Sequence, residues 1–285
     1  GEFYVWVNRC SHRGAEICRN RHGKSEDGTF TCVYHQWAFT AAGDCVGVPF
    51  RKGHQGKGGF PKDFKPSDRP LQKLKVESLG GAIFASFAHD GPTLEAYLGP
   101  VMVKMMKRVL CKPLEYLGVT RQYVNANWKL YTENTKDPYH ASLLHLFHAT
   151  FGVYRSTMGG GCQVGGPLGM HSLLSAYIIE DEDKSEYEKG DLRSYDTDVK
   201  LADTSVLQVT PEVDPVFTNH IQSILPSMIL QQIHNTLAVR QVLPKGVGRF
   251  ELIFHFFGYE DDTPELRAER IRQMNLVGPA GYISM

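Results

Sequence analysis

Two short cysteine–histidine pairs constrain this chain more than any other feature. Cys10-Ser11-His12 and Cys32-Val33-Tyr34-His35 offer two thiolates and two imidazoles from separate segments. Such a set suits either a Cys2His2 zinc ion or a Rieske [2Fe–2S] cluster, in which two Cys bind one iron and two His bind the other. Structural zinc sites usually place both cysteines in one C-x2-4-C knuckle, whereas here each segment gives one Cys and one His. The spacing therefore favours the iron–sulfur cluster and leaves zinc as the alternative.

The residues around the two pairs point the same way. Arg13-Gly14 follows the first pair and Gln36-Trp37 follows the second, and with these neighbours the segment resembles the Rieske family. One departure is that 19 residues separate His12 from Cys32, slightly more than is usual. The extra length lies in the polar run Arg19 to Asp27, which we expect on the surface.

Composition excludes several classes of protein. The 285 residues correspond to about two average domains. Lys and Arg (31) balance Asp and Glu (31), so no basic surplus supports binding to nucleic acid or to a membrane surface. The longest apolar stretches, such as Gly81 to Phe87 and Leu252 to Phe257, are too short to span a bilayer. Six cysteines are too few for a disulfide scaffold. Cys18 and Cys45 have no partner at ligand spacing and are predicted to be core thiols.

The ends and the element pattern suggest two domains of a longer protein. Gly1 stands in place of Met and the chain closes on Gly-Pro-Ala-Gly-Tyr-Ile-Ser-Met, so we expect a fragment that lacks both ends. Residues 1–88 show short strands separated by Gly, Asp, Lys and Pro. The helical pattern from Pro92 to Leu110 marks the boundary, and residues 89–285 form the second domain. There we predict helices over 127–149 and 263–274, a flexible loop over 156–172 with six glycines, and strands over 116–126, 219–233, 235–243 and 249–259.

A second group of metal-binding side chains lies in residues 127–145. Asp137, His140 and His145 offer a carboxylate and two imidazoles. A spacing of five residues sets the two imidazoles about 140° apart on an ideal helix, so joint ligation needs a distortion, for which Pro138 offers one place. Taken alone this group is ambiguous, because a His on an apolar helix is more often a core residue and an Asp before a Pro can be a helix N-cap.

Together with the upstream pairs, this segment resembles the large subunit of Rieske non-haem iron ring-hydroxylating oxygenases. The shared pattern is N-W-K-x-x-x-E-N followed by D-x-x-H-x4-H. The resemblance implies that His140 and His145 bind a mononuclear Fe(II). It also implies that Asp137 links this iron to the Rieske cluster of a neighbouring subunit. His148 has no counterpart in the pattern and is predicted to be structural.

The third iron ligand is expected outside the printed sequence. This type of iron uses two His and one carboxylate. In similar proteins an acidic residue follows a G-P-A-G-x-I-S-M stretch, which here is residues 278–285. The resemblance therefore implies a carboxylate ligand just beyond Met285. Asp261 and Asp262 are acidic candidates within the chain, but they follow a strand at a polar turn and carry little weight.

The resemblance also implies a fold, partners and a reaction. It is nearest to the large subunits of salicylate 5-hydroxylase, anthranilate dioxygenase and terephthalate dioxygenase, in the stretches 34–37, 143–151, 231–245 and 276–285. We therefore expect an α+β fold, with an antiparallel β Rieske domain followed by a helix-covered antiparallel sheet. The implied protein is a cytoplasmic terminal oxygenase and a homotrimer, possibly with small β subunits. It would take electrons from NADH through a separate reductase, perhaps with a ferredoxin. One or two oxygen atoms would enter the product.

The chemistry of one arginine, Arg240, suggests a class of substrate. Arg240 lies in the predicted strand 235–243, which is apolar on both faces, so its charge needs a partner. A carboxylate of an aromatic acid would suit the guanidinium, and an internal pair with Glu251 or Glu133 is the equal alternative.

Three general readings remain open at this stage. They are an oxygenase, a Rieske electron-transfer protein without oxygenase activity, and a zinc-stabilised binding module. The glycines at 159–169 lack the preceding strand and following helix of a nucleotide loop, so NADH is expected to bind elsewhere.

Overall fold

The chain folds into two compact units. The computed structural model describes residues 1–179, 182–190, 192, 195–213 and 216–277. The first unit comprises Gly1–Ser78 and Ile83–Thr93, and the second comprises Leu79–Ala82 and the chain from Leu94 onward. The predicted boundary between residues 88 and 89 falls a few residues before Leu94. The G-P-A-G-x-I-S-M stretch, residues 278–285, lies outside the described residues.

The first unit is built from short strands and long ordered loops. Its antiparallel sheet has the order β1-β2-β3, and β4 and β5 form a separate hairpin. The strands are β1 (Thr29–Thr31), β2 (Ala38–Thr40), β3 (Cys45–Gly47), β4 (Lys75–Leu79) and β5 (Ala82–Ser86). The buried side chains of this unit form one cluster: Cys10, Ile17, Cys32, Trp37, Phe39, Cys45 and Leu71. Cys45 is thus a core thiol, as predicted, and both cysteines of the metal-binding pairs lie in the same core.

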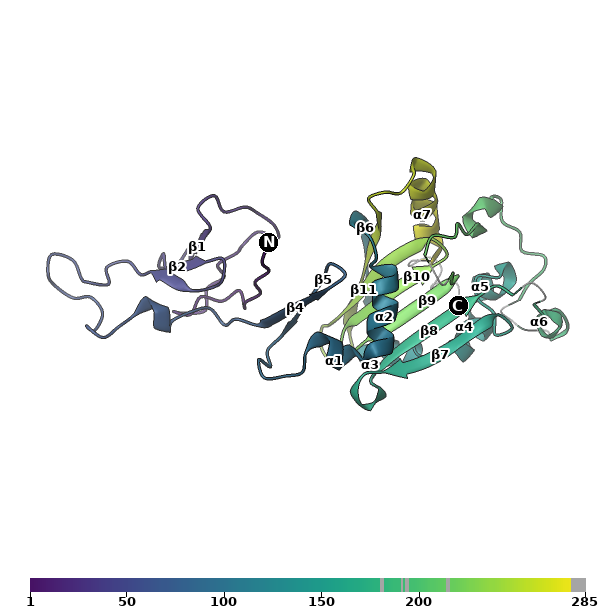
Figure 1. The fold of residues 1–285 in the computed structure, drawn as a ribbon, viewed down its shortest axis with the longest axis horizontal. Helices are drawn as coiled ribbons and strands as arrows, with labels where there is room; N and C mark the ends of the chain where they lie inside the picture. Colours follow the sequence, from purple (N-terminus) through teal and green to yellow (C-terminus); the bar gives the residue numbers. More distant parts are fainter. Residues whose placement is uncertain (180–181, 191, 193–194, 214–215, 278–285) are drawn as a thin grey trace. The chain divides into compact units, whose positions relative to one another are not determined.

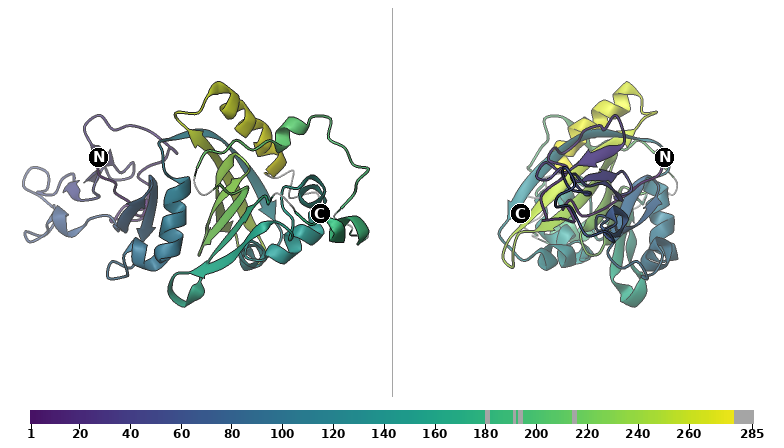
Figure 2. Two further views of the ribbon diagram at one scale, coloured as in Figure 1. Left: turned by 45° about the vertical axis from the view of Figure 1, so that its right-hand side comes forward. Right: turned by 90° about the vertical axis from the view of Figure 1, so that its left-hand side faces the viewer.

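The second unit is organised around a seven-stranded antiparallel sheet. Its strand order is β6-β12-β11-β10-β9-β8-β7, so the strands from β7 to β12 form a meander and the early strand β6 is added beside β12 (Figure 1). Figure 2 shows the same sheet from two further directions. The strands are β6 (Leu114–Val124), β7 (Gly159–Gly165), β8 (His171–Tyr177), β9 (Asn219–Ile224), β10 (Met228–Ile233), β11 (Thr236–Pro244) and β12 (Phe250–Tyr259). The α+β architecture expected from the sequence is confirmed.

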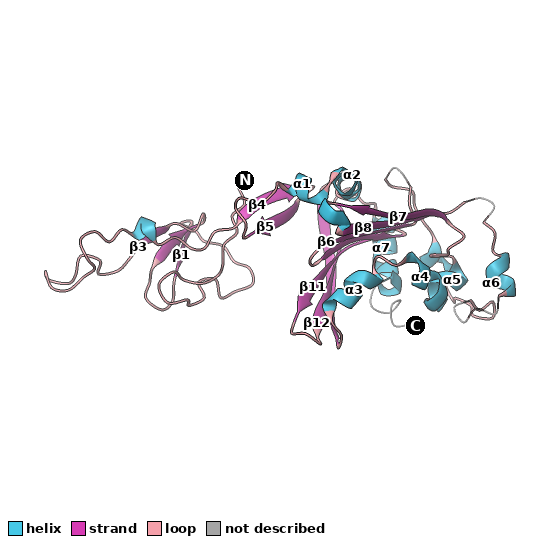
Figure 3. Cartoon of the chain, turned by 90° about the horizontal axis from the view of Figure 1, so that it is seen from below, coloured by secondary structure: helices cyan, strands magenta, loops and turns pink. Residues whose placement is uncertain are grey.

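Helices cover both faces of this sheet. Figure 3 shows α2 (Pro100–Val109) on one side and α3 (Trp128–Asn134), α4 (Pro138–Leu144) and α5 (Leu146–Phe151) on the other. Two adjacent residues of β9 agree with this arrangement. The amide of Gln222 donates to Met102 O of α2, whereas the hydroxyl of Ser223 contacts that of Thr135, at the end of α3. Because neighbouring residues of a strand point to opposite faces, α2 and α3 lie on opposite sides.

Further helices and turns complete the described elements. They are α1 (Leu94–Leu98), α6 (Ser185–Lys189), α7 (Pro264–Val277) and the 3-10 turns η1 (Pro66–Asp68), η2 (Pro167–Gly169) and η3 (Thr204–Leu207). Within the described part of the chain, none of the helices is both long and apolar enough to cross a membrane.

The predicted flexible loop at residues 156–172 is wrong, because it contains strand β7. This strand pairs with β8 from Gly159↔Tyr177 to Gly165↔His171. Its glycines suit a crowded backbone, since a Cβ at Gly160 would lie 2.1 Å from Ser175 O and its φ is +130°. Glycine weakens local strand propensity, so the pattern alone reads as a loop, and pairing with β8 overrides it.

Two other predicted elements are divided in the structure. The single helix predicted for residues 92–110 breaks into α1 and α2 at Gly99, whose φ is +80° and which precedes Pro100. The single strand predicted for 219–233 is two strands, β9 and β10, joined by a turn around Pro226.

Candidate metal centres

The first candidate centre is formed by two loops with the same backbone pattern. In the first loop, Cys10 N–H donates to Ala15 O at 2.8 Å and Gly14 N–H donates to Cys10 O at 2.8 Å. In the second, Cys32 N–H donates to Trp37 O and Gln36 N–H donates to Cys32 O, at 2.8 and 2.9 Å. Gly14 and Gln36 both have positive φ, 73° and 56°. Each cysteine–histidine pair is therefore held by a closed turn with an equivalent reversal of the chain.

The four predicted ligands come together at the ends of these turns. The Cys10 and Cys32 thiols are buried and lie within hydrogen-bonding reach of each other. The His12 and His35 rings lie on the outer side, with centroids 4.6 Å apart. Trp37 stacks on His12 at 4.7 Å, with the ring planes only 8° apart. The sequence prediction that residues 10, 12, 32 and 35 form one site agrees with this geometry.

This arrangement fits a two-iron cluster. Paired thiols inside and paired imidazoles outside match a cluster whose two irons have different ligands. Nδ1 of His12 is buried and has no hydrogen-bond partner among the described residues, as expected of an atom that binds a metal. Burial raises the pKa of the Cys10 thiol, so loading with metal would displace a proton. No group of three or more His, Cys, Asp or Glu in the described ranges has the geometry of a single metal ion.

The second candidate centre lies where α3, α4 and α5 follow each other. Asn127 caps α3 by accepting from Lys129 N–H at 3.0 Å. Asp137 caps α4 by accepting from Tyr139 N–H at 2.8 Å, with Pro138 as the first helical residue. Both N-caps follow from the residue types, because Asn and Asp accept from free amides and Pro tolerates the first turn.

The distortion that brings the two histidines together occurs at His145, not at Pro138. His145 ends α4 and precedes α5, with φ −93° and ψ 91°. Pro138 precedes both histidines and so cannot change their relative direction. With the helix broken at His145, the ring centroids of His140 and His145 lie 5.4 Å apart.

Neighbouring polar groups hold the His140 ring. Its Nδ1 lies 3.3 Å from Asp137 Oδ2, and its Nε2 lies 2.9 Å from Asn134 Nδ2. The Asp137 carboxylate favours the tautomer with its proton on Nδ1, so the Nε2 lone pair accepts from the Asn134 amide here and is the atom that a metal would bind in place of that amide. Burial lowers the pKa of His145 to about 4, so its imidazole stays neutral, which is the form that binds metals. Asn134 was not predicted, although its place in the N-W-K-x-x-x-E-N pattern marks it.

A cleft opens beside these histidines. His148 was predicted to be structural, yet it also lines this cleft, and its ring centroid lies 5.0 Å from that of His145. Burial lowers its pKa to about 3. The helical spacing of His145 and His148 is the sequence signal that could have placed both on one side.

Arg240 lines the same cleft and is fully buried. Its Nε donates to Gln231 Oε1 at 2.6 Å and a terminal nitrogen donates to the Tyr131 hydroxyl at 3.0 Å. The two internal partners considered from sequence are engaged elsewhere. Glu251 pairs with Arg121 and Lys245, and Glu133 pairs with Lys136.

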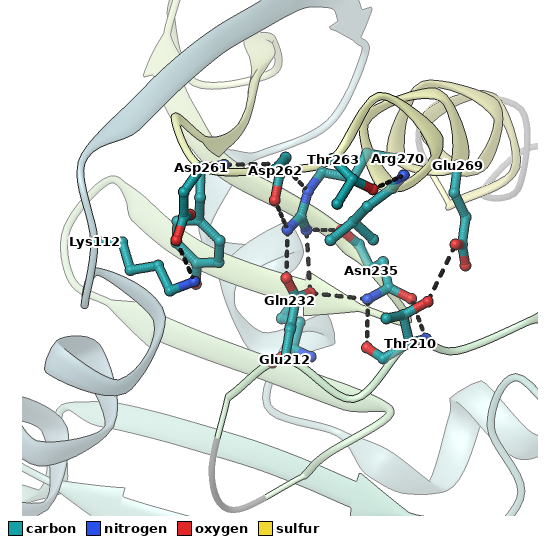
Figure 4. Close-up of polar contacts among 12 residues, drawn as sticks. Lys112, Thr210, Glu212, Gln232, Asn235, Asp261, Asp262, Thr263, Glu269 and Arg270 are labelled. Carbon is teal, nitrogen blue, oxygen red and sulfur yellow. Dashed lines mark hydrogen bonds and ion pairs between the residues drawn. The ribbon is translucent and has the colours of Figure 1, made fainter.

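The acidic candidates Asp261 and Asp262 are not among the described residues that line this cleft. Figure 4 shows Asp261 paired with Lys112 and Asp262 paired with the buried Arg270. Asp262 also accepts from Tyr259 N–H at 3.0 Å. Both carboxylates therefore serve structural ion pairs, which agrees with the little weight that the sequence gives them.

Comparison with known families agrees with both centres. Residues 1–64 match the family described as Rieske [2Fe-2S] domain. Residues 103–277 match the family described as ring hydroxylating alpha subunit (catalytic domain). The chain belongs to the Rieske ring-hydroxylating α subunits. A zinc module and a Rieske protein without a catalytic domain are thereby set aside.

Individual relatives support the same assignment. The chain is 52% identical to the anthranilate 1,2-dioxygenase large subunit of Burkholderia cepacia, over 100% of this chain and 67% of that protein. It is 43% identical to a terephthalate 1,2-dioxygenase α subunit of Comamonas sp, over 100% and 68%. Naphthalene 1,2-dioxygenase from Rhodococcus sp. has the same fold, with a TM-score of 0.75 at 22% identity, over 99% and 66%. The chain thus spans about two thirds of the length of these Rieske ring-hydroxylating proteins.

Proposed function

We propose that this chain is the terminal oxygenase component that hydroxylates an aromatic carboxylate of the salicylate, anthranilate or terephthalate type. The reaction would use O2 and electrons that pass from NADH through a separate reductase. One observation carries the proposal: the imidazoles of His140 and His145 and the buried guanidinium of Arg240 line the same cleft. The two imidazoles can hold an iron, and the guanidinium can hold the carboxylate of an aromatic ring beside that iron.

The described side chains divide between the two metal groups. Cys10 and Cys32 would hold one iron of the [2Fe–2S] cluster, and His12 and His35 the other. His140 and His145 would hold the mononuclear iron, together with a carboxylate from beyond Met285. When bound, the cluster supplies single electrons and the mononuclear iron supplies the activation of O2.

The packing of α7 supports the origin of the third ligand. Val277, at the end of this helix, packs in one cluster with Ile233 and Ile221. Both isoleucines line the cleft. Val277, the last described residue, therefore lies next to the proposed iron site.

Asp137 would connect the two metal centres of neighbouring copies in a homotrimer. Its side chain is about half exposed while it contacts the His140 ring. A carboxylate with one side on an iron ligand and the other at the surface suits a contact with the cluster of a second copy. A ferredoxin, small β subunits and a cytoplasmic location belong to the same proposal.

Arg240 would select the substrate by its charge. Contacts with the neutral side chains of Gln231 and Tyr131 orient the guanidinium. A guanidinium in this low-dielectric setting favours an anionic ligand strongly. Aromatic acids are the matching class, and the cleft walls of Leu174, Ile221 and Ile233 suit the ring.

Oxygen uptake by the full-length protein tests the proposal. With a reductase and NADH, we expect salicylate, anthranilate or terephthalate to stimulate O2 consumption, whereas neutral toluene and naphthalene do not. Product analysis with labelled O2 then counts whether one or two oxygen atoms enter. Stimulation by the neutral hydrocarbons alone would contradict a carboxylate-selective cleft.

A further inference from the structure

The two units carry opposite net charges although the whole chain is neutral. The first unit has 13 Lys and Arg against 9 Asp and Glu, a net charge of +4, and the second has 18 against 22, a net charge of −4. Most of the positive excess lies in one loop, Phe50–Lys65. It holds five cations, Arg51, Lys52, Lys57, Lys62 and Lys65, and one anion, Asp63.

These five cations are available to a partner. All five side chains are exposed. In the described ranges none of them forms an ion pair, whereas Lys73 and Lys75 in the same unit pair with Asp44 and Glu77. Unpaired exposed charges of one sign create a field that attracts an anionic surface.

The loop is ordered by its own backbone. His54 and Lys57 exchange hydrogen bonds of 2.9 and 3.0 Å, and Phe60 N–H donates to Arg51 O at 2.9 Å. Gly53 and Gly59 have positive φ, and a Cβ on either would lie less than 3 Å from backbone atoms of the loop. The cations are therefore presented on a defined turn rather than on a loose tether.

Aromatic rings connect this loop to the cluster ligands. Phe60 in the loop is partly exposed and its ring centroid lies 6.2 Å from that of Trp37. Trp37 in turn stacks on His12 at 4.7 Å. The second imidazole, His35, has a different neighbour, the exposed ring of Tyr34 at 3.8 Å. The two imidazole ligands thus face two separate routes to the surface.

We propose that the Phe50–Lys65 loop docks an acidic one-electron carrier protein and that its electron reaches the cluster through Phe60, Trp37 and His12. One electron leaves the reduced carrier and arrives at the cluster, and no bond is made or broken. This inference rests on the proposed function, in which the cluster both receives and passes on electrons. The exposed His35 side then remains for the outgoing transfer. Weak redox encounters depend on small, electrostatically steered surfaces of this kind.

Charge reversal in the loop tests the docking surface. The full-length holoenzyme is compared with the triple variant Lys52→Glu, Lys57→Glu, Lys62→Glu. The matched control is Arg19→Glu, Arg21→Glu, Lys24→Glu, which makes the same charge change on an exposed run of the same unit. The probe is a reduced, acidic plant-type [2Fe–2S] ferredoxin. Stopped-flow absorbance follows cluster reduction at several ionic strengths, and calorimetry gives the Kd of the oxidised ferredoxin.

The loop variant should lose the electrostatic attraction that speeds its association with the ferredoxin. At low salt we expect its bimolecular rate to fall about 30-fold or more, with a weak dependence on salt and a weaker Kd, while the control stays within about 3-fold of the parent. A loop variant that stays within about 3-fold, or a control that falls equally, would overturn the proposal. Loss of the oligomer in the loop variant would also overturn it, because the loop would then bind a second copy.

Two further experiments test the electron route through Phe60 and the proposed oxygenase function independently of docking. Phe60→Ala should lower the limiting rate at saturating ferredoxin several-fold, whereas Phe3→Ala, which removes an exposed ring of the same unit outside the loop, should leave that rate unchanged. Equal limiting rates in both variants would overturn the route through Phe60.

Single turnover after chemical reduction of the cluster by dithionite bypasses docking of the ferredoxin. Product from all variants in that arm keeps the proposed function intact, and product from none counts against the function rather than the docking surface.

Discussion

At the scale of single residues, Arg240 gives the most direct test of how the substrate is selected. In Arg240→Gln the polar contact remains but the charge is lost. We expect the apparent affinity for an aromatic acid to weaken about 100-fold, since a buried charge-assisted pair contributes about 3 kcal/mol. Initial rates of O2 uptake against acid concentration measure this. Arg249→Gln, which removes an exposed guanidinium that stacks on Tyr123, is the control and should change little. Unchanged affinity in Arg240→Gln would refute the assignment.

A buried histidine on the opposite face of the sheet predicts how stability depends on pH. Burial lowers the pKa of His220 to about 3, and its Nε2 contacts Gln222. Its neutral form is therefore favoured in the folded state, whereas the unfolded state binds a proton below about pH 6.5. Stability should be complete above pH 6.5 and should fall as the pH drops toward 3.

The size of this effect is measurable with one substitution. At pH 5 the cost from His220 is about 2 kcal/mol. In His220→Gln, the loss of unfolding free energy between pH 7 and pH 5 should therefore be smaller than in the parent by about that amount. Urea unfolding at the two pH values measures it. An equal loss in both proteins would show that His220 does not control the acid sensitivity.

Residue identities in the two centres were predictable because short motifs fix ligand types and spacing. Cys10, His12, Cys32 and His35 meet as the pattern implies. The local backbone was not predictable in the same way. The helix break at His145 depends on how α4 and α5 pack, and no breaker residue marks it. For the same reason the approach of His148 to the cleft was missed.

At the scale of elements, α7 depends on one buried arginine. Arg270 is fully buried and bonds to Asp262, Glu212 and the backbone oxygen of Asn235 (Figure 4). The bond to Asn235 fastens the helix to the turn between β10 and β11, and the bond to Glu212 fastens it to the segment before β9. Removing the guanidinium would leave two buried carboxylates without their cation, which is far more costly than losing a surface pair.

Arg270→Leu should therefore destabilise the protein by about 3–5 kcal/mol. The control on the same helix is Arg267→Leu, which loses an exposed pair with Glu115 and should cost less than about 1 kcal/mol. Chemical denaturation measures both. Adding Asp262→Asn and Glu212→Gln to Arg270→Leu should recover part of the loss. Similar costs for the two arginine variants would show that the buried network is not what anchors α7.

Element types were predictable where periodicity is strong and less so where glycine intervenes. Strands β11 and β12 lie within a residue or so of their predicted ranges, because both are long and rich in β-branched and aromatic residues. Strand β7 was missed because its glycines have low strand propensity and only the pairing with β8 defines it.

At the scale of the whole molecule, Asp137 predicts that copies of the chain cooperate. Asp137→Asn should keep a reducible cluster and lower turnover about 100-fold or more. Hybrid oligomers with a second chain, Cys10→Ser, that lacks the cluster should recover activity. In these hybrids the Cys10→Ser chain supplies an intact iron site with Asp137, and the Asp137→Asn chain supplies the cluster.

The matched comparison is each variant alone, since neither should turn over substrate. Coexpression with two different affinity tags isolates the hybrid, and product formation is measured per chain. Hybrids as inactive as their parents would place electron transfer within one chain.

The metal content of the full-length protein tests directly whether two separate iron sites share this polypeptide. Quantitative analysis of iron, zinc and acid-labile sulfide per chain is the direct measurement. The account predicts about three irons and two sulfides, from one [2Fe–2S] cluster and one mononuclear site. Zinc in place of iron, with no acid-labile sulfide, would contradict it.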